Sequence, residues 1–194
     1  MLPDNTLSAV EEKEFLPPRN EIVRRTESRE LGGIALANNS EPFTHKWYGY
    51  LQGRAICANR RDEAPTTLLY TTGNVTEVSL TFDQNMRPTI CYVEDGMVKL
   101  YWYDASLASM TITEYPAASS PRVSLDDKRK FNIGNSDIIF AYVMDNNRLC
   151  YRLQRERYGI EHTLLVDEEK TIIDPLVLNT IGMSTDNRFL FSTN

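Results

Sequence analysis

The sequence predicts an all-β protein built from antiparallel sheets, and three observations support this fold class. From residue 44 onward, runs rich in Val, Ile, Thr and aromatic residues recur at short spacing. Turn-forming residues separate the runs, as in Glu94-Asp95-Gly96 and Asp145-Asn146-Asn147. No long pattern with helical periodicity interrupts them. We therefore expect residues 43–194 to form an all-β body.

Each run is short, apolar or alternating, and bounded by polar turn residues, which is the pattern of a strand. In chain order, the expected strands are 45–50, 54–58, 67–71, 76–82, 89–93, 98–103, 110–114, 122–125, 137–144, 148–154, 159–166, 176–183 and 188–192.

An internal repeat indicates how these strands are grouped. A displacement of 50 positions aligns Tyr92 with Tyr142, Asp95 with Asp145, and Tyr101 with Tyr151. Upstream, Val78-Ser79-Leu80 resembles Val123-Ser124-Leu125, so the second unit carries extra residues, which we place in the polar stretch 128–134. The repeat predicts two blade-like four-stranded units at about 75–116 and 120–166. They could form part of a propeller or two similar halves of one sandwich.

Residues 1–42 differ from the body and are expected to form an extended N-terminal arm. They contain several prolines, among them Pro17 and Pro18, and a charge-dense stretch at 19–30. Residues 8–15 have the pattern of a short helix with a capping box, which the two prolines would end. Disorder is one interpretation of the arm. Docking onto a neighbouring subunit is the interpretation we favour, because isolated apolar residues such as Phe15 and Ile22 need a surface to cover them.

The predicted repeats also bear on oligomeric state. Two four-stranded units cannot close a propeller, which usually takes four or more blades. Unpaired sheet edges must be covered, charged or paired with another chain. We therefore expect either a homo-oligomer or a sandwich that covers its own edges.

Composition excludes several functional classes. The chain carries 21 Lys and Arg against 27 Asp and Glu, a formal net charge of -6, whereas nucleic-acid-binding proteins usually show a basic surplus. It has no apolar run long enough to span a membrane, and its N-terminus does not read as a signal peptide. The three cysteines, Cys57, Cys91 and Cys150, lie far apart in apolar runs. Buried free thiols and assembly in a reducing cytoplasm are expected.

No motif in the sequence indicates catalysis, so we expect no enzyme activity, no cofactor and no metal. The only histidines are His45 and His162, and the cysteines lack metal-site spacing. Strand alternation places Tyr101 and Tyr103 on one face and Trp102 on the other. These aromatic residues suit a core, a protein interface or sugar stacking, and the core is the favoured interpretation.

Several segments resemble a family of small virion proteins of tailed bacteriophages. The resemblance rests mainly on residues 78–88, 99–104, 120–129, 136–139 and 154–158, with further likeness at 17–19 and 31–36. It implies a structural protein of the tail or the head–tail region, located in the virion and assembled in the host cytoplasm. It implies other tail proteins as partners and a homo-oligomer in a symmetric ring, since repeated heterologous contacts close rings.

Composition and loop position indicate which residues would make such contacts. They are Pro17, Pro18, Arg19, Arg24 and Arg25 in the arm, and Asp126, Asp127, Lys128 and Arg129 in the long polar loop. The main alternative function is a carbohydrate- or host-receptor-binding module, with Trp102 and Trp47 as the first candidates for sugar contact. A glycan-cleaving enzyme is a third possibility, but it needs a facing carboxylate pair that the sequence does not show.

Overall fold

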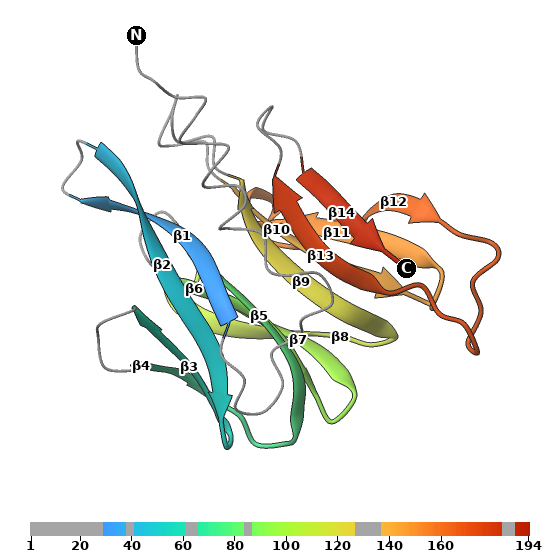
Figure 1. Ribbon diagram of the computed structural model, residues 1–194, viewed down its shortest axis with the longest axis horizontal. Helices are drawn as coiled ribbons and strands as arrows, with labels where there is room; N and C mark the ends of the chain where they lie inside the picture. The colour runs from blue at the N-terminus through green and yellow to red at the C-terminus, as the bar shows by residue number, and fades with distance from the viewer. Residues whose placement is uncertain (1–28, 38–40, 61–65, 84–86, 127–136, 184–188) are drawn as a thin grey trace, which may run out of the picture.

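The computed structural model describes residues 29–37, 41–60, 66–83, 87–126, 137–183 and 189–194 (Figure 1). Side chains are described within 51–58, 66–83, 87–125, 137–181 and 189–194. The described chain is all-β with antiparallel pairing throughout, as the sequence predicts. The elements are β1 (Arg29–Ala37), β2 (Glu41–Gln52), β3 (Ala55–Arg60), β4 (Thr66–Tyr70), β5 (Val75–Phe82), β6 (Pro88–Glu94), β7 (Met97–Asp104), β8 (Ser109–Tyr115), β9 (Ala118–Asp126), β10 (Asp137–Met144), β11 (Arg148–Leu153), the 3-10 turn η3 (Gln154–Glu156), β12 (His162–Val166), β13 (Leu178–Met183) and β14 (Phe189–Thr193).

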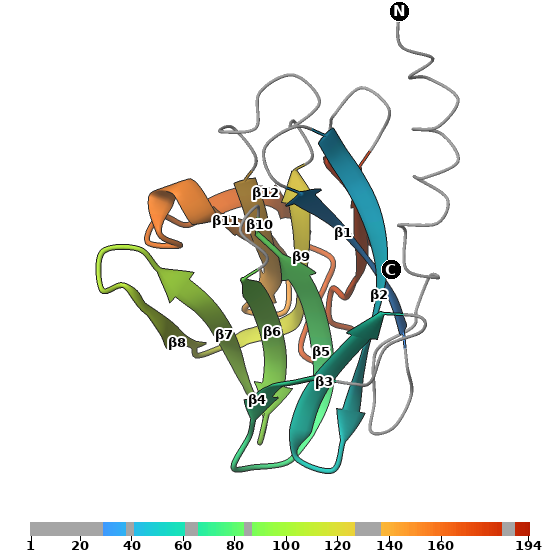
Figure 2. The ribbon, with the colours of Figure 1, turned by 90° about the vertical axis from the view of Figure 1, so that its left-hand side faces the viewer.

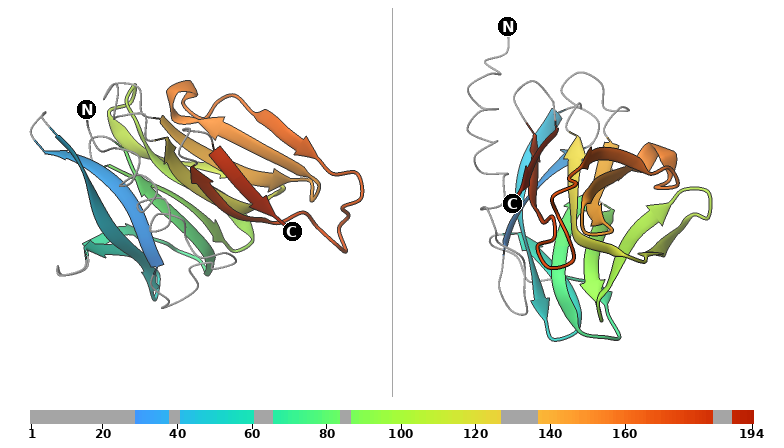
Figure 3. Two further views of the ribbon diagram at one scale, coloured as in Figure 1. Left: turned by 45° about the horizontal axis from the view of Figure 1, so that its top comes forward. Right: turned by 90° about the vertical axis from the view of Figure 1, so that its right-hand side faces the viewer.

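The strands form four sheets in which neighbours in sequence are neighbours in space. We call them sheet I (β1–β4), sheet II (β5–β8), sheet III (β9–β12) and sheet IV (β13 and β14). Sheets I, II and III follow one another along the longest axis of the molecule, and sheet IV lies against sheet III (Figures 1, 2 and 3). The first strands of successive sheets contact each other: β1 meets β5, β5 meets β9, and β9 meets β13.

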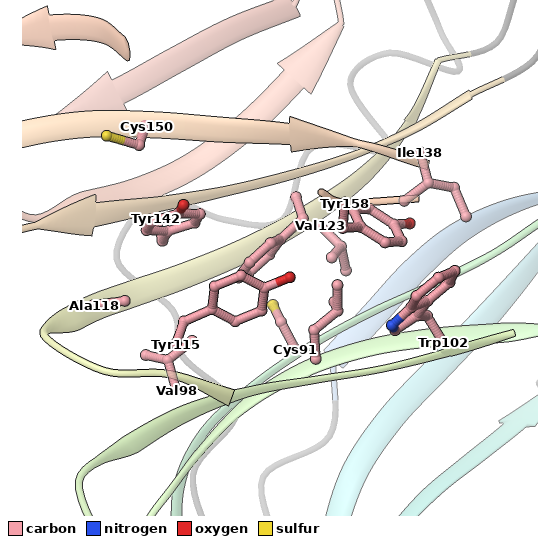
Figure 4. Close-up of a cluster of buried hydrophobic side chains, with 12 residues drawn as sticks. Cys91, Val98, Trp102, Tyr115, Ala118, Val123, Ile138, Tyr142, Cys150 and Tyr158 are labelled. Carbon is pink, nitrogen blue, oxygen red and sulfur yellow. The ribbon is translucent and has the colours of Figure 1, made fainter. Parts of the chain in front are cut away.

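Three apolar layers hold the stack together. One, which includes Leu51, Ile56 and Leu80, lies between sheets I and II. A second lies between sheets II and III, where side chains from both sheets meet around Tyr115 and Tyr142 (Figure 4). The third joins sheet III to sheet IV. Sheets II and III are therefore covered on both faces, and this explains why β6 and β10 contain runs of consecutive buried residues rather than strict alternation.

Strand β10 shows this double coverage most clearly. Every residue from Asp137 to Val143 is buried. Ile138 and Phe140 face sheet II, whereas Ile139 and Ala141 face sheet IV. Strand alternation thus sends successive side chains into different cores. The same rule holds in β7, where Trp102 enters the layer between sheets II and III.

The first strand, β1, was not among the expected strands. The sequence assigns 1–42 to the arm, but Arg29–Ala37 pairs with β2 along its whole length, with Gly32 opposite Lys46 and Gly33 opposite His45. The two glycines lower the strand propensity of this segment. The segment is nevertheless a strand, because its backbone hydrogen bonds to β2 stabilise it. The boundary at residue 42 therefore divides a sheet. Residues 1–28, including the expected helix at 8–15, lie outside the described residues.

Sheets II and III span the two units that the repeat predicts. Asp95 and Asp145 occupy equivalent turns, with φ values of 50° and 53°. Each donates its backbone N–H to the backbone oxygen of a residue that precedes the first strand of its own sheet, Asn74 in sheet II and Ala117 in sheet III. The repeat therefore has a structural counterpart in the backbone of the two turns.

One pair in the sequence alignment is wrong. Glu94 pairs with Met97 across a two-residue turn, whereas Met144 pairs with Arg148 across a three-residue turn. Successive side chains of a strand point to opposite faces of the sheet. The additional turn residue therefore places every later side chain of the second unit on the opposite face from the residue with which the sequence alignment pairs it. Tyr101, opposite Ile90, is thus equivalent to Arg152, opposite Phe140, and not to Tyr151.

The three cysteines are free and buried, as the sequence predicts. Burial raises the pKa of Cys91 to about 12, so its thiol stays protonated at neutral pH. These thiols therefore act as small apolar groups in the cores.

Candidate interaction surfaces

Most of the contact residues predicted from the sequence lie outside the described residues. They are Pro17, Pro18, Arg19, Arg24, Arg25, Asp127, Lys128 and Arg129. Asp126 is the last residue of β9 and pairs with Asp137 of β10, although its side chain is not described. The contact role of this set stays a prediction.

The Glu94 side chain fixes the junction between sheets I and II. Its Oε1 accepts hydrogen bonds from the backbone N–H groups of Thr72 (2.7 Å) and Gly73 (2.6 Å), and its Oε2 lies 2.9 Å from Lys99 Nζ. Burial opposes ionisation, but these N–H groups and the ammonium prevail and lower the pKa of Glu94 to about 2. The carboxylate is therefore ionised at neutral pH and holds the β4–β5 connection against the end of β6.

Arg122 on β9 links three sheets at the place where their first strands meet. Its Nη1 lies 3.1 Å from Glu77 Oε2 of β5, and its Nε donates to the backbone oxygen of Asn179 on β13 at 3.0 Å. The side chain is 7% exposed, so this ion pair is buried against the partly covered Glu77. The contact ties sheet III to both of its neighbours.

At one end of sheets II and III, buried carboxylates hold exposed arginines. Arg157, which follows η3, donates to Asp104 Oδ2 at the end of β7 at 2.7 Å. Hydrogen bonds from Arg157 and Ser106 lower the pKa of Asp104 to about 2. Arg155 Nε lies 3.4 Å from Asp137 Oδ2. The side chains of Arg155 and Arg157 remain 66% and 60% exposed, so most of their N–H groups face solvent.

Two exposed apolar side chains accompany these arginines. Leu107 lies in the turn between β7 and β8, and Ile160 lies shortly after η3. The Asp104–Arg157 ion pair holds these two segments together, and Figure 2 shows them on the same side of the molecule. We call Leu107, Arg155, Arg157 and Ile160 the arginine patch.

A further polar cluster is built within sheet III beneath its outer edge. Tyr142 Oη donates to Glu161 Oε2 at 2.7 Å and accepts from Arg152 Nε at 2.7 Å. The Arg152 guanidinium lies 5.2 Å from the centre of the Tyr115 ring. The hydrogen bond from Tyr142 and the guanidinium of Arg152 lower the pKa of Glu161. The groups satisfy one another, and the cluster serves to join strands β10, β11 and β12.

Most of the exposed large apolar side chains fall in one short stretch of the sequence, which runs along β12 from one end of sheet III to the other. Six of the ten large apolar side chains that are exposed in the described structure lie between residues 160 and 173. They are Ile160, Leu164, Leu165, Val166, Ile172 and Ile173. Where exposed apolar side chains lie side by side they can mark interaction surfaces, whereas single ones need no such explanation.

The most exposed of these side chains lie on an ordered loop between β12 and β13. Ile172 and Ile173 are 85% and 96% exposed. Thr171 Oγ1 accepts from the backbone N–H groups of Ile173 and Asp174 at 3.3 Å each, and Lys170 Nζ lies 3.1 Å from Asp174 Oδ2. We call residues 167–177 the isoleucine loop. Figure 3 shows it projecting from the end of the stack.

The isoleucine loop is anchored at both ends and acidic between them. The backbone N–H groups of Asp167 and Leu176 donate to the oxygens of Asn147 (2.9 Å) and Asn146 (2.7 Å). Besides Asp167 and Asp174, it carries Glu168 and Glu169, whereas Lys170 is its only basic residue. The two isoleucines are thus presented in a fixed position within a negatively charged surround.

The structure corrects one candidate for sugar binding. Trp102 is 5% exposed, and its Nε1 donates to Thr113 Oγ1 at 3.1 Å. Its ring packs edge-on against Tyr158 at a centroid distance of 5.1 Å. It is a core residue, and a sugar ring has no access to its face. Trp47 belongs to β2, and its side chain is not among those described.

Neither a metal cluster nor a membrane helix is found in the described part of the chain. Within it, no group of three or more His, Cys, Asp or Glu side chains could hold a metal ion. It also contains no helix that is long and apolar enough to cross a membrane.

Comparison with known proteins gives no relative. No family model matches the chain, and neither a curated protein nor a solved structure matches it.

Two features of these surfaces were not anticipated from the sequence. The link through Arg122 depends on contacts between strands far apart in the chain, which no local pattern reveals. The isoleucine loop did carry a signal, since Ile172-Ile173 stands between acidic residues and just before Pro175, outside any expected strand. Adjacent isoleucines in a polar loop, outside any expected strand, are a signal that large apolar side chains remain exposed.

Proposed function

We propose that the protein is a structural component of a bacteriophage tail or head–tail region that assembles with neighbouring tail proteins. The observation that carries the proposal is the concentration of exposed apolar side chains between residues 160 and 173. In a chain whose sheets already bury three apolar layers, these side chains are left for contact with other molecules. The resemblance of residues 78–88 and 120–129 to small virion proteins supports the same assignment.

The architecture suits a building block. Sheets I to III are four-stranded meanders whose first strands lie against one another, as do the blades of a propeller. We infer that the chain is an open stack of such blades rather than a closed ring. The ion pairs of Glu94, Arg122 and Asp104 would keep the sheets fixed relative to one another when neighbouring subunits bind.

Open sheet edges add a second kind of contact. Strand β12 forms the outer edge of sheet III, and three of its apolar side chains, Leu164, Leu165 and Val166, are exposed. Strand β14 is the outer strand of a sheet of only two. Such edges are templates for pairing with another chain. We propose that neighbouring subunits or other tail proteins cover them in the virion.

The proposal is tested on purified particles of the phage that encodes the protein. We expect the protein at a fixed copy number per particle, and we expect particles made without it to have incomplete tails. Absence of the protein from purified particles that infect normally would contradict the proposal.

The arm is tested by complementation with altered chains. Charge reversal by Arg24→Glu with Arg25→Glu should reduce incorporation into particles. A deletion of residues 1–28 is the better-placed truncation, because one ending at 42 would also remove β1. Normal incorporation of both folded variants would remove the arm from the proposed contacts, whereas the assembly role of the body would remain.

A further inference from the structure

We propose that copies of this chain associate head to tail, with the isoleucine loop of one copy seated on the arginine patch of the next. The inference deepens the proposed assembly role and rests on it in one respect, namely that the protein associates with itself. Three properties of the two surfaces carry it: their positions, their chemistry and their rigidity.

The two surfaces lie at opposite ends of the same sheet. Arg157 follows β11 and pairs with Asp104 at the end of β7, so the arginine patch lies where β7 and β11 end. Strand β12 runs antiparallel to β11, and Val166 at its end pairs with Arg148 at the start of β11. The isoleucine loop therefore begins at the other end, roughly 20 Å away for a strand of this length. It cannot reach the arginine patch of its own chain.

The surfaces are complementary in chemistry. The loop presents Ile172 and Ile173 within a surround that includes the exposed Glu168 and Glu169. The patch presents Leu107 and Ile160 beside the exposed guanidinium groups of Arg155 and Arg157. Apolar side chains can thus meet apolar side chains while carboxylates meet guanidiniums, and such a pairing can be bidentate.

The acidic surround also selects the class of partner. A membrane that carries anionic lipids repels a loop with this charge, although its isoleucines alone could enter a lipid surface. A protein surface with exposed arginines attracts it, and the same chain supplies one. A contact between two different surfaces is heterologous, so it generates a ring or a filament rather than an isolated symmetric dimer.

Both surfaces are held in place before association. The loop is fixed by the Thr171 hydrogen bonds, the Lys170–Asp174 ion pair and the backbone bonds to Asn146 and Asn147. The patch is fixed by the buried carboxylates of Asp104 and Asp137. Little conformational freedom is therefore lost on binding.

The test uses two variants of the full chain, each lacking one surface. Ile172→Asp with Ile173→Asp removes the loop contact, and Leu107→Asp with Ile160→Asp removes the patch contact. All four side chains are exposed, so both variants should keep the wild-type circular dichroism spectrum. Ile112→Asp on β8 is the matched control, because Ile112 is an exposed isoleucine that belongs to neither surface.

Sedimentation velocity over a concentration series then separates the outcomes. We expect the wild type and the Ile112→Asp control to associate, and each double variant alone to remain monomeric. An equimolar mixture of the two double variants should form a dimer and nothing larger, because only one pair of intact surfaces remains. Failure of the mixture to dimerise, or association of either variant alone at wild-type strength, would overturn the inference.

A charge exchange tests direct contact between the two surfaces. Glu169→Arg and Arg155→Glu should each weaken association at least tenfold, and the chain that carries both should recover most of the loss. Lack of recovery would overturn the assigned pairing. A monomeric wild type would overturn the inference but leave the particle test of the proposed function open, whereas association through other surfaces would overturn only the inference.

Discussion

Sheets II and III share one plan but use their outer strands differently. In both, four antiparallel strands run in order, and both faces of the inner strands are covered. The outer strand of sheet II, β8, exposes one large apolar side chain, Ile112, whereas the outer strand of sheet III, β12, exposes three in a row. The difference indicates that burial between sheets determines the residues of the inner strands, whereas the exposed apolar side chains of β12 are the ones for which we propose contacts with other molecules.

The covering of the two sheets also differs. Sheet II lies between two four-stranded sheets, whereas one face of sheet III is covered by the two strands of sheet IV alone. Leu165 and His162 on β12 remain partly or largely exposed, with His162 stacked on Tyr151 at a centroid distance of 4.8 Å. The comparison therefore predicts large effects for changes inside the stack and small effects on stability at the edge of sheet III.

The largest effect is expected at Phe140. This side chain is fully buried and packs against Tyr115 and Tyr142, with ring centroids 4.9 Å away in each case. Phe140→Ala should lower the free energy of unfolding by about 4 kcal/mol through lost burial and a cavity. Ile90→Ala, at the equivalent place in sheet II, should cost about 3 kcal/mol. Urea unfolding measures both, and a loss below 1 kcal/mol at Phe140 would refute the core assignment.

The next effect tests the link between sheets II, III and IV. Arg122→Ala removes one partner of a buried ion pair and leaves Glu77 without its cation. We expect a loss of about 3 kcal/mol in the free energy of unfolding. Arg148→Ala is the control, since its ion pairs with Asp145 and Glu161 are more exposed and should together contribute about 1 kcal/mol or less. Equal losses for the two variants would show that Arg122 does not join the sheets.

A pH dependence is expected from Glu94 at the junction of sheets I and II. Its pKa is about 2 in the folded chain against an ordinary value of 4.5, so the native state favours the ionised form. The corresponding stabilisation, about 3 kcal/mol, is fully present above pH 4.5 and is lost as the pH falls toward 2.

Glu94→Gln tests that assignment. The amide oxygen can still accept from Thr72 and Gly73, but the attraction to Lys99 is lost, so we expect a cost of about 2 kcal/mol at pH 7. The stability of the variant should fall less between pH 4.5 and pH 2 than that of the wild type. Parallel curves for the two proteins in acid unfolding would assign the pH dependence to other carboxylates.

The smallest effect on stability is expected at the isoleucine loop. Ile172→Ser with Ile173→Ser should change the free energy of unfolding of the monomer by less than about 0.5 kcal/mol, because both side chains are exposed. The same change should reduce self-association, which light scattering measures. A large loss of monomer stability would mean that the isoleucines stabilise the fold. It would contradict the distinction between buried residues, which stabilise the monomer, and exposed residues at the edge of sheet III, which do not.

The sequence predicts the all-β class and strands that overlap β2 to β14, because their apolar patterns and turns are local. It does not reveal β1, where Gly32 and Gly33 mask a strand that forms through pairing with β2. It also misaligns Tyr101 with Tyr151, since a single additional turn residue changes the facing of a side chain without changing its type. Strand identity is a local property, whereas register depends on the partner strand.

The interaction surfaces were less accessible to sequence reasoning than the fold. Composition directed attention to Arg24, Arg25 and residues 126–129, and the described side chains do not test these positions. The arginine patch brings Leu107 and Arg157 together from different sheets, so no local pattern could show it. The apolar pair Ile172-Ile173 could be seen in the sequence within a polar loop. Only the structure shows that both side chains are exposed rather than buried in a core.

Cysteine cross-linking tests the head-to-tail contact most directly. The natural cysteines are all buried, so cysteines introduced as Glu169→Cys in the isoleucine loop and Ala105→Cys beside the arginine patch would react with little background. Mixing the two single variants under mild oxidation should give a disulfide-linked heterodimer, whereas Thr66→Cys on β4 in place of Ala105→Cys should not. Symmetric Glu169→Cys homodimers as the dominant product, or equal yields with the Thr66→Cys control, would contradict head-to-tail association.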